Sequence, residues 1–223
     1  SLVVYGCTIA RLPAPSRVSV MIPVYNEEES LVTLHRELDA ALASVAGGAE
    51  IVFVDDGSKD RSLAVLREIA EKDPRVRVVV LDGNHGQTAA FAAGFDAVRG
   101  EITVTLDADL QNDPADIPRL IAKMDAEGAD VVNGVRQKRR DSWVRLVSSR
   151  IANNARNWVT NESVTDVGCS LRAMRTEYVK RVRLFRNMHR FLPTLLRMEG
   201  ATKIVEMPVA HRERRYGVSK YGI

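Results

Sequence analysis

Ile51-Val52-Phe53-Val54-Asp55-Asp56-Gly57-Ser58 decides the fold, because a short apolar run passes directly into a polar turn. The four apolar residues are β-branched or aromatic and do not alternate with polar ones, which is typical of a strand buried on both faces of a sheet. The glycine and the polar residues that follow favour a tight turn. This arrangement indicates a parallel sheet whose functional residues lie in loops at the carboxyl ends of the strands.

The same pattern recurs along the first 135 residues, where each apolar run is followed by apolar residues at helical spacing. The expected strands are residues 18–24, 50–54, 76–81, 102–106 and 131–135, and the expected helices are residues 28–45, 61–72, 88–98 and 116–127. Alternation of this kind predicts the α/β class, with a mostly parallel central sheet flanked by helices. Beyond residue 135 we expect a long helix over residues 141–159 and a strand over residues 203–209.

Length and composition predict one globular domain. The chain has 223 residues, of which 45 % are apolar and 27 % charged, as in ordinary soluble proteins. We expect an N-terminal tail over residues 1–16 and a single domain over residues 17–223. Cys7 and Cys169 are too far apart in the sequence to indicate a disulfide framework or a zinc site, which favours a reducing, cytoplasmic setting. No apolar run is long enough to cross a membrane.

Charge is distributed unevenly, although the net charge is only +3. Residues 1–135 contain 12 Lys and Arg against 22 Asp and Glu, whereas residues 136–223 contain 20 against 7. The acidic part suits a cation, and the basic part suits phosphate or an anionic membrane surface. A set of solvated helix faces without a specific partner is the alternative.

Asp107-Ala108-Asp109-Leu110-Gln111 places two carboxylates and an amide at alternating positions directly after an expected strand. Oxygen ligands in this pattern can face one hard cation, and Mg²⁺ or Mn²⁺ suits such a sparse site because these ions also take water and substrate phosphate oxygens as ligands. A polar turn that caps the next helix is the alternative, and Asn112-Asp113-Pro114 could fill that role alone.

Asp56 also follows directly after an expected strand. Its carboxylate could accept hydrogen bonds from a base or a ribose, while Gly57 would allow the ligand to approach the backbone. The alternative is a turn in which Ser58 or Asp60 caps the next helix.

Four motifs in order resemble those of glycosyltransferase family 2. They are Val20-Met21-Ile22-Pro23-Val24-Tyr25-Asn26-Glu27, Val54-Asp55-Asp56-Gly57-Ser58, Asp107-Ala108-Asp109-Leu110-Gln111 and Arg214-Arg215-Tyr216-Gly217-Val218-Ser219-Lys220. The resemblance covers about residues 17–222 and, within that family, is strongest to polyprenyl-phosphate glycosyltransferases of the dolichyl-phosphate mannose synthase type.

The resemblance implies a GT-A fold and an inverting transfer from a UDP- or GDP-linked sugar to a polyprenyl phosphate, dependent on Mg²⁺ or Mn²⁺. It implies a nucleotide half over residues 17–135, a basic acceptor half over residues 136–223, and a longer natural protein that is peripheral to or anchored at the cytoplasmic membrane. The implied nucleotide-binding residues are Pro23, Tyr25, Glu27, Asp56 and Gly57; those for metal and diphosphate are Asp107, Asp109 and Gln111; those for the acceptor are Arg136, Arg145, Ser149, Arg214, Ser219 and Lys220.

A phosphate acceptor is already an anion at neutral pH, so positioning and charge neutralisation suffice and no general base is needed. Arg136 and Arg214 would then act beside Asp107 and Asp109 by offsetting the repulsion between the phosphates. If the acceptor were a sugar hydroxyl, a base would be required and Asp166 is the candidate, although it could instead hold a loop or a basic neighbour such as Arg172.

Two other classes of protein fit less well. Nucleotidyltransferases use a glycine- and arginine-rich loop after the first strand, and this chain has Pro23-Val24-Tyr25-Asn26-Glu27 there. Proteins that bind single-stranded nucleic acid interleave basic residues with aromatic ones, and only 5 % of this chain is aromatic. We therefore expect no nucleic-acid partner.

Overall fold

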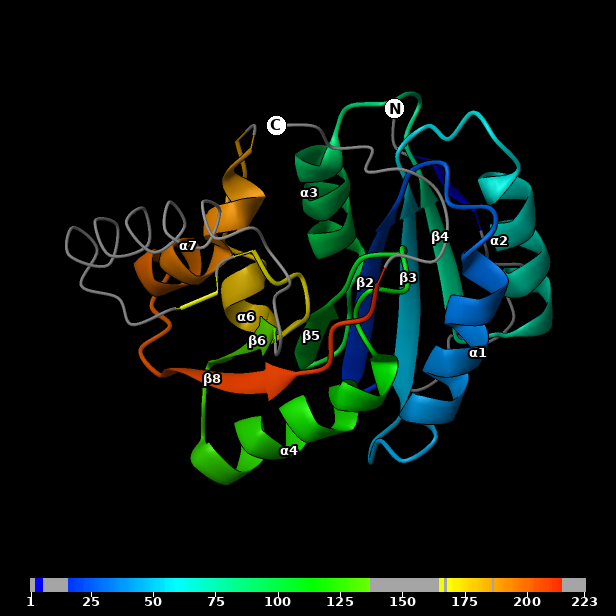
Figure 1. The fold of residues 1–223 in the computed structure, drawn as a ribbon. Helices are drawn as coiled ribbons and strands as arrows, with labels where there is room; N and C mark the ends of the chain where they lie inside the picture. Colours follow the sequence, from blue (N-terminus) through cyan, green and yellow to red (C-terminus); the bar gives the residue numbers. More distant parts are fainter. Residues whose placement is uncertain (1–2, 6–15, 137–164, 167, 186, 214–223) are drawn as a thin grey trace.

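A computed structural model describes residues 3–5, 16–136, 165–166, 168–185 and 187–213. One central sheet is covered by helices on both faces (Figure 1), which confirms the expected α/β class. The helix expected over residues 141–159 lies outside the described residues. Within the described ranges, no helix is long and apolar enough to cross a membrane.

The helices and strands expected over the first 135 residues are all present, with ends within three residues of the expected ones, but β1 lies in the stretch expected to be an N-terminal tail. The strands are β1 (Val3–Tyr5), β2 (Val18–Val24), β3 (Ala49–Asp55), β4 (Val76–Val80), β5 (Ile102–Thr105), β6 (Val131–Arg136), β7 (Arg172–Arg175) and β8 (Ile204–Val209). The helices are α1 (Leu31–Leu42), α2 (Ser62–Lys72), α3 (Gln87–Ala97), α4 (Ile117–Glu127), α6 (Thr176–Val179) and α7 (Leu192–Met198), with 3-10 helices η1 (Pro114–Asp116) and η2 (Met188–Phe191).

The strands form one eight-stranded sheet in the order β1-β4-β3-β2-β5-β7-β6-β8. Strands β4, β3, β2 and β5 are parallel, as are β6 and β8. Strands β1 and β7 run the opposite way. The mostly parallel sheet is thus confirmed, but β7 was not expected, because its residues Arg-Ala-Met-Arg lack the apolar run that marks the other strands.

Two apolar cores lie on the two faces of the sheet. Successive side chains of a strand point to opposite faces, so Ile51 and Phe53 of β3 join one core and Val52 and Val54 join the other. The first core is covered by α1, α2 and α4, and the second by α3, α6 and α7. Each fully buried side chain of this kind stabilises the fold by about 1.5–3 kcal/mol.

Helix α3 lies very close to the sheet because its inner face carries small residues. A Cβ atom added to Gly94 would lie 2.5 Å from Cγ of Met21 in β2, a contact too short to be tolerated. This close packing fixes the first residue of the helix, Gln87, near the carboxyl ends of the strands.

Candidate active site

The expected site residues gather at one edge of the sheet, because β2, β3, β5 and β6 run in the same direction and end there. Three loops follow these strands: residues 25–30 after β2, residues 56–61 after β3 and residues 106–113 after β5. Arg136 is the last residue of β6. The described part of the structure therefore brings together the groups that the sequence analysis assigned to the nucleotide, the metal and part of the acceptor site.

The loops after β2 and β3 are joined by hydrogen bonds. Asn26 donates its backbone N–H to Oγ of Ser58 at 2.9 Å and accepts the N–H of Lys59 on Oδ1 at 2.7 Å. Glu27 donates its backbone N–H to Oγ of Ser62 at 2.8 Å. Asn26 has φ 54°, a left-handed conformation that asparagine tolerates better than most residues. These bonds hold the loop with Tyr25 in place before any ligand binds.

Asp56 holds a third loop, between β4 and α3. Its two carboxylate oxygens accept the backbone N–H groups of His85 at 2.8 Å and Gly86 at 2.9 Å. Burial raises the pKa of Asp56, and these two hydrogen bonds partly oppose that rise. Gly57 has φ +65°, and a Cβ there would lie 2.4 Å from the carbonyl carbon of Gly83. The pair Asp56 and Gly57 therefore fixes where residues 83–86 lie.

Asp55 is a site candidate that the sequence analysis passed over. It is only 1 % exposed, and its Oδ1 has no hydrogen-bond partner among the described residues. Its Oδ2 accepts the N–H of Ser58 at 3.3 Å, and burial raises its pKa. A buried carboxylate oxygen without a partner costs free energy unless a ligand binds it. The doubled acid in the sequence was the available signal, because either carboxyl group could face the ligand.

The loop after β5 presents the expected metal-binding residues. Asp107 accepts a hydrogen bond from Nε2 of Gln87 at 3.1 Å. Asp109 is 8 % exposed and accepts the backbone N–H of Gln111 at 3.1 Å, across Leu110 with φ 63°. The loop is thus folded by its own carboxylate. Gln87 was not expected in the site, because nothing in the sequence relates it to a residue twenty positions later.

This donor set fits a hard divalent cation that is only partly coordinated by protein. Asp107, Asp109 and Gln111 supply oxygen donors alone, which is the chemistry that Mg²⁺ and Mn²⁺ take. No group of three or more His, Cys, Asp or Glu in the described residues could hold a metal ion by itself. A cation here would therefore need oxygen ligands from water or from a bound phosphate as well.

A separate residue caps the helix that follows, as the sequence analysis allowed. Asp113 accepts the N–H of Ala115 at the start of η1. It also pairs with Arg212 at 2.6 Å, and Arg212 donates its backbone N–H to the carbonyl of Gln111 at 2.7 Å. Asp107 and Asp109 are therefore not needed as helix caps. The segment after β8 is fastened to the loop of the expected metal site.

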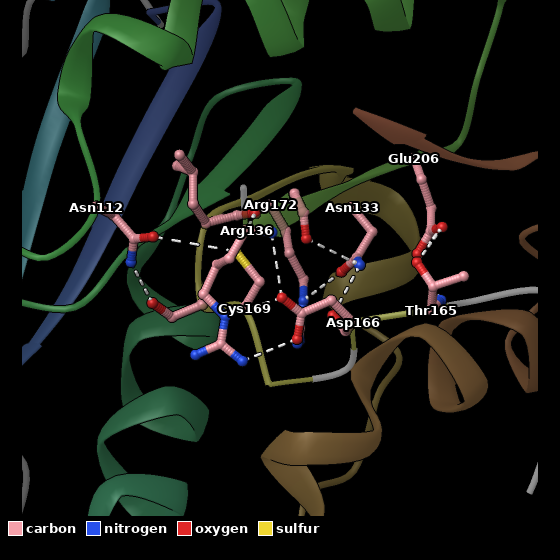
Figure 2. Close-up of polar contacts among 11 residues, drawn as sticks. Asn112, Asn133, Arg136, Thr165, Asp166, Cys169, Arg172 and Glu206 are labelled. Atoms are coloured by element: carbon pink, nitrogen blue, oxygen red, sulfur yellow. Dashed lines mark hydrogen bonds and ion pairs between the residues drawn. The ribbon is translucent and has the colours of Figure 1, made fainter. Parts of the chain in front are cut away.

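Arg136 and Asp166 form a forked ion pair (Figure 2). Nε and Nη2 of Arg136 donate to the two oxygens of Asp166, both at 2.8 Å, and the backbone N–H of Arg136 also donates to Oδ2 at 3.2 Å. The side chains are 17 % and 6 % exposed. Such a two-point pair between largely buried charges fixes the plane of the guanidinium group. Asp166 therefore holds a basic neighbour, Arg136.

Arg172 lies beside Asn133 and Asp166 (Figure 2) and is 3 % exposed. Its Nε donates to Oδ1 of Asn133 at 2.8 Å, and Nδ2 of Asn133 donates to the carbonyl of Asp166 at 3.0 Å. Burial lowers the pKa of Arg172, and the nearby Cys169, Asp166 and Asp107 oppose that change. A positively charged side chain is therefore buried next to the site. No motif in the sequence indicated that Asn133 and Arg172 are in contact.

Cys169 is a structural thiol. It is fully buried, and burial raises the pKa of its thiol to about 11. Its Sγ lies 3.8 Å from the carbonyl of Leu171, to which the thiol donates. A cysteine that stays protonated at neutral pH is neither a good nucleophile nor a metal ligand. Cys169 packs in the first apolar core as a buried thiol.

Five residues assigned to the acceptor lie outside the described residues: Arg145, Ser149, Arg214, Ser219 and Lys220. Of the expected acceptor set, the described part of the chain contains Arg136 alone. Pro23 is buried at the end of β2, and Tyr25, Glu27 and Gln111 are partly exposed in their loops.

The strand order and the loops at the carboxyl ends of the strands are those of the GT-A fold. The structure resembles that of glucosyl-3-phosphoglycerate synthase from Mycobacterium tuberculosis in complex with Mn²⁺, uridine diphosphate and glucosyl-3-phosphoglycerate. The match has a TM-score of 0.69 and 21 % identity, and covers 91 % of this chain and 73 % of that one. The expected GT-A fold is confirmed.

The chain belongs to glycosyl transferase family 2, whose sequence model matches residues 19–183. It is 46 % identical over 207 residues to the undecaprenyl-phosphate 4-deoxy-4-formamido-L-arabinose transferase of Edwardsiella ictaluri, covering 92 % of this chain. It is 45 % identical over 210 residues to the enzyme of the same name from Klebsiella pneumoniae, covering 94 % of this chain. The chain spans 63 % and 64 % of the lengths of these two relatives.

Proposed function

We propose that this chain is the catalytic part of an inverting glycosyltransferase that moves a sugar from a UDP- or GDP-linked donor to a polyprenyl phosphate. Two relatives at 45–46 % identity carry the name of an undecaprenyl-phosphate sugar transferase, which supports the acceptor class. The observation that carries the proposal is the Arg136–Asp166 pair, which holds a guanidinium group in a fixed orientation at the same sheet edge as the carboxylates after β5.

The register of the sheet places the two groups near each other. Thr105 of β5 and Asn133 of β6 both pair with Arg172 of the intervening strand. Asp107 and Arg136 lie two and three residues beyond that common level, in the same direction. Two strands separated by one other lie about 10 Å apart. This spacing leaves room for a sugar between a donor diphosphate at Asp107 and an acceptor phosphate at Arg136.

In the proposed site, Asp107, Asp109 and Gln111 hold a divalent cation. The cation would supply charge stabilisation for the departing nucleoside diphosphate. Gln87 orients Asp107 through its hydrogen bond, so the carboxylate is held in place before the donor binds. Asp55 and the loop with Tyr25 would form the nucleotide pocket, beside residues 83–86 that Asp56 holds.

Arg136 would bind the acceptor phosphate and offset its repulsion by the donor diphosphate. A phosphate oxygen is already anionic, so no proton must be removed before it attacks the sugar. The alternative, in which Asp166 is a base for a sugar hydroxyl, is less well supported, since both oxygens of Asp166 accept from Arg136. We place the full protein at the cytoplasmic face of a membrane, where a polyprenyl phosphate resides.

A donor panel tests the proposal. UDP- and GDP-sugars are incubated with the chain, with and without polyprenyl phosphate and Mn²⁺ or Mg²⁺, and released nucleoside diphosphate is measured. We expect release above background only when acceptor lipid and metal are both present. Asp125→Asn, which changes an exposed carboxylate, serves as the active control for Asp109→Asn. Faster release with a free sugar than with the lipid phosphate would overturn the proposed acceptor.

A further inference from the structure

Exposed apolar side chains are concentrated in one part of the described chain. Its large hydrophobic residues that are clearly exposed are Phe185 at 68 %, Phe191 at 46 %, Met198 at 78 % and Val32 at 62 %. The first three fall within fourteen consecutive residues, around η2 and α7, whereas Val32 stands alone on α1. Single exposed hydrophobic residues are normal, but a local group of them indicates a contact surface.

The chain around Phe185 is built to hold these side chains outward. Between α6 and η2, Val182 and Leu184 pack against the second core, while the residues between and beside them, Arg181, Arg183 and Phe185, are exposed. In α7, Leu192 and Leu196 are fully buried and Met198 is not. The inward residues fasten the segment to the domain, so the exposed apolar side chains are not the result of a loose end.

The same stretch is strongly basic. Residues 180–198 contain six Lys and Arg and no Asp or Glu: Lys180, Arg181, Arg183, Arg186, Arg190 and Arg197. Of these, Arg181, Arg183 and Arg190 are exposed in the structure, and Arg181 also pairs with Glu177 at 3.5 Å. A surface with both apolar and cationic side chains suits the interface of an anionic bilayer. The apolar side chains enter the headgroup region and the cationic side chains contact the lipid phosphates.

Hydrogen bonds connect this stretch to the active site. Oγ1 of Thr88, in the first turn of α3, accepts the backbone N–H of Asn187 at 3.0 Å and lies 2.8 Å from Nδ1 of His189. His189 also stacks on Phe91 of α3, with ring centroids 5.6 Å apart. Gln87, the residue before Thr88, donates to Asp107. The exposed surface is therefore tied through one helical turn to the expected metal site.

We propose that the surface formed by Phe185, Phe191 and Met198 with Arg181, Arg183 and Arg190, here the Phe185–Met198 surface, docks on an anionic lipid bilayer. The proposal rests on the proposed function, because docking is useful only if the acceptor phosphate is anchored in a bilayer and must reach the active site from there. It goes further in naming the residues that meet the lipid.

Vesicle sedimentation tests the proposal with the chain alone. The probes are vesicles of phosphatidylcholine and vesicles of equal parts phosphatidylcholine and phosphatidylglycerol. We expect binding to the anionic vesicles only, falling at least roughly tenfold in Phe185→Ser/Phe191→Ser/Met198→Ser. The matched control is Val32→Ser, which removes an equally exposed apolar side chain from α1 and should bind as the unaltered chain does.

Charge is tested separately. Arg183→Glu/Arg190→Glu should abolish the preference for anionic vesicles, whereas Lys72→Glu on α2 should preserve it. Undiminished binding by both surface variants would overturn the proposal. The proposal would also be overturned if the unaltered chain were a dimer and the triple variant a monomer, because a second copy of the chain would then cover the surface. A large fall in the melting temperature of the triple variant would also overturn it, by showing that the side chains are packed within the domain.

Failure of the proposed function gives a different result. Transfer to a short-chain polyprenyl phosphate dissolved in detergent needs no bilayer, so the triple variant should retain it. Suppose that the unaltered chain shows no transfer but sediments with anionic vesicles, and that the triple variant does not. The docking proposal is then supported and the proposed reaction is refuted.

Discussion

Asp166→Asn separates the two reactions considered for this site. In the structure, Asp166 accepts three hydrogen bonds from Arg136 and leaves that arginine oriented at the end of β6. Asparagine has the same shape but no charge, and one of its two terminal atoms donates rather than accepts. The substitution therefore turns one arm of the fork from attraction to repulsion and leaves a largely buried guanidinium without its counter-charge.

The expected loss of stability follows from burial. Removing one partner of a buried ion pair costs about 3–5 kcal/mol. The Arg136 side chain is 17 % exposed and asparagine still accepts one hydrogen bond, so we expect a smaller loss of about 2–4 kcal/mol. With Arg136 no longer fixed, the KM for polyprenyl phosphate should rise about 10- to 100-fold, with kcat and the donor KM little changed.

Urea unfolding and steady-state kinetics with each substrate varied in turn check both expectations. Asp125→Asn is the matched control, because Asp125 pairs with Arg17 at 2.6 Å with the two side chains 41 % and 29 % exposed. An exposed pair of this kind contributes at most about 1 kcal/mol. The control should therefore lose little stability and no activity.

A different kinetic pattern would refute the reasoning. If Asp166 were a general base, its loss would lower kcat by about 100- to 10,000-fold. The acceptor KM would stay normal, and the acid limb of the pH profile would disappear. That result, with unchanged stability, would favour a sugar hydroxyl acceptor.

Three further predictions concern other parts of the site. Asp109→Asn should lower turnover at least about 100-fold while stability changes little, because asparagine keeps the oxygen that accepts from Gln111; turnover that recovers fully at saturating Mn²⁺ would count against direct coordination. Gly57→Ala should destabilise the fold by at least about 2 kcal/mol, because Gly57 has a left-handed backbone and a Cβ there would meet the loop at residue 83. Gly128 is also left-handed but has open space around it, so Gly128→Ala should cost only about 1 kcal/mol. Equal losses of stability for the two variants in urea unfolding would contradict the close contact at Gly57. Burial, with the nearby charges of Arg190 and Arg172, lowers the pKa of His189 to about 4. The unfolded chain therefore takes up a proton that the folded chain does not, so stability should fall as pH drops from 6.5 towards 4; His189→Gln should lessen that fall, and an unaltered pH dependence would refute the assignment.

The sequence predicted the parallel part of the sheet well because each strand there is a continuous apolar run followed by a helix. Strand β7 was not predicted, and the reason is physical. Arg172 is held by a neighbour far along the chain, so it can be buried beside Asn133 although the local sequence looks polar. Periodicity reports which face of an element is apolar, but not which distant residue compensates a charge.

The same distinction between local and long-range properties applies to the residues of the candidate site. Strand ends followed by polar residues located Asp107, Asp109 and Asp56, since the chemistry and the position of these groups are both local properties. The contacts of Gln87 with Asp107 and of Arg136 with Asp166 depend on tertiary packing. For that reason the sequence could name Arg136 and Asp166 as candidates without showing that they form a pair.

The strand order also bears on how members of this family could be recombined. Strand β6 belongs to the first part of the chain, yet it lies between β7 and β8 from the second part. A chimera that joins the nucleotide half of one enzyme to the acceptor half of another near residue 136 would therefore place a foreign strand in the middle of the donated sheet. Acceptor preference should be exchanged by moving β6, β7 and β8 together, with the junction before residue 131, so that the β6–β7 and β6–β8 pairings each come from one parent and only the β5–β7 pairing joins the two.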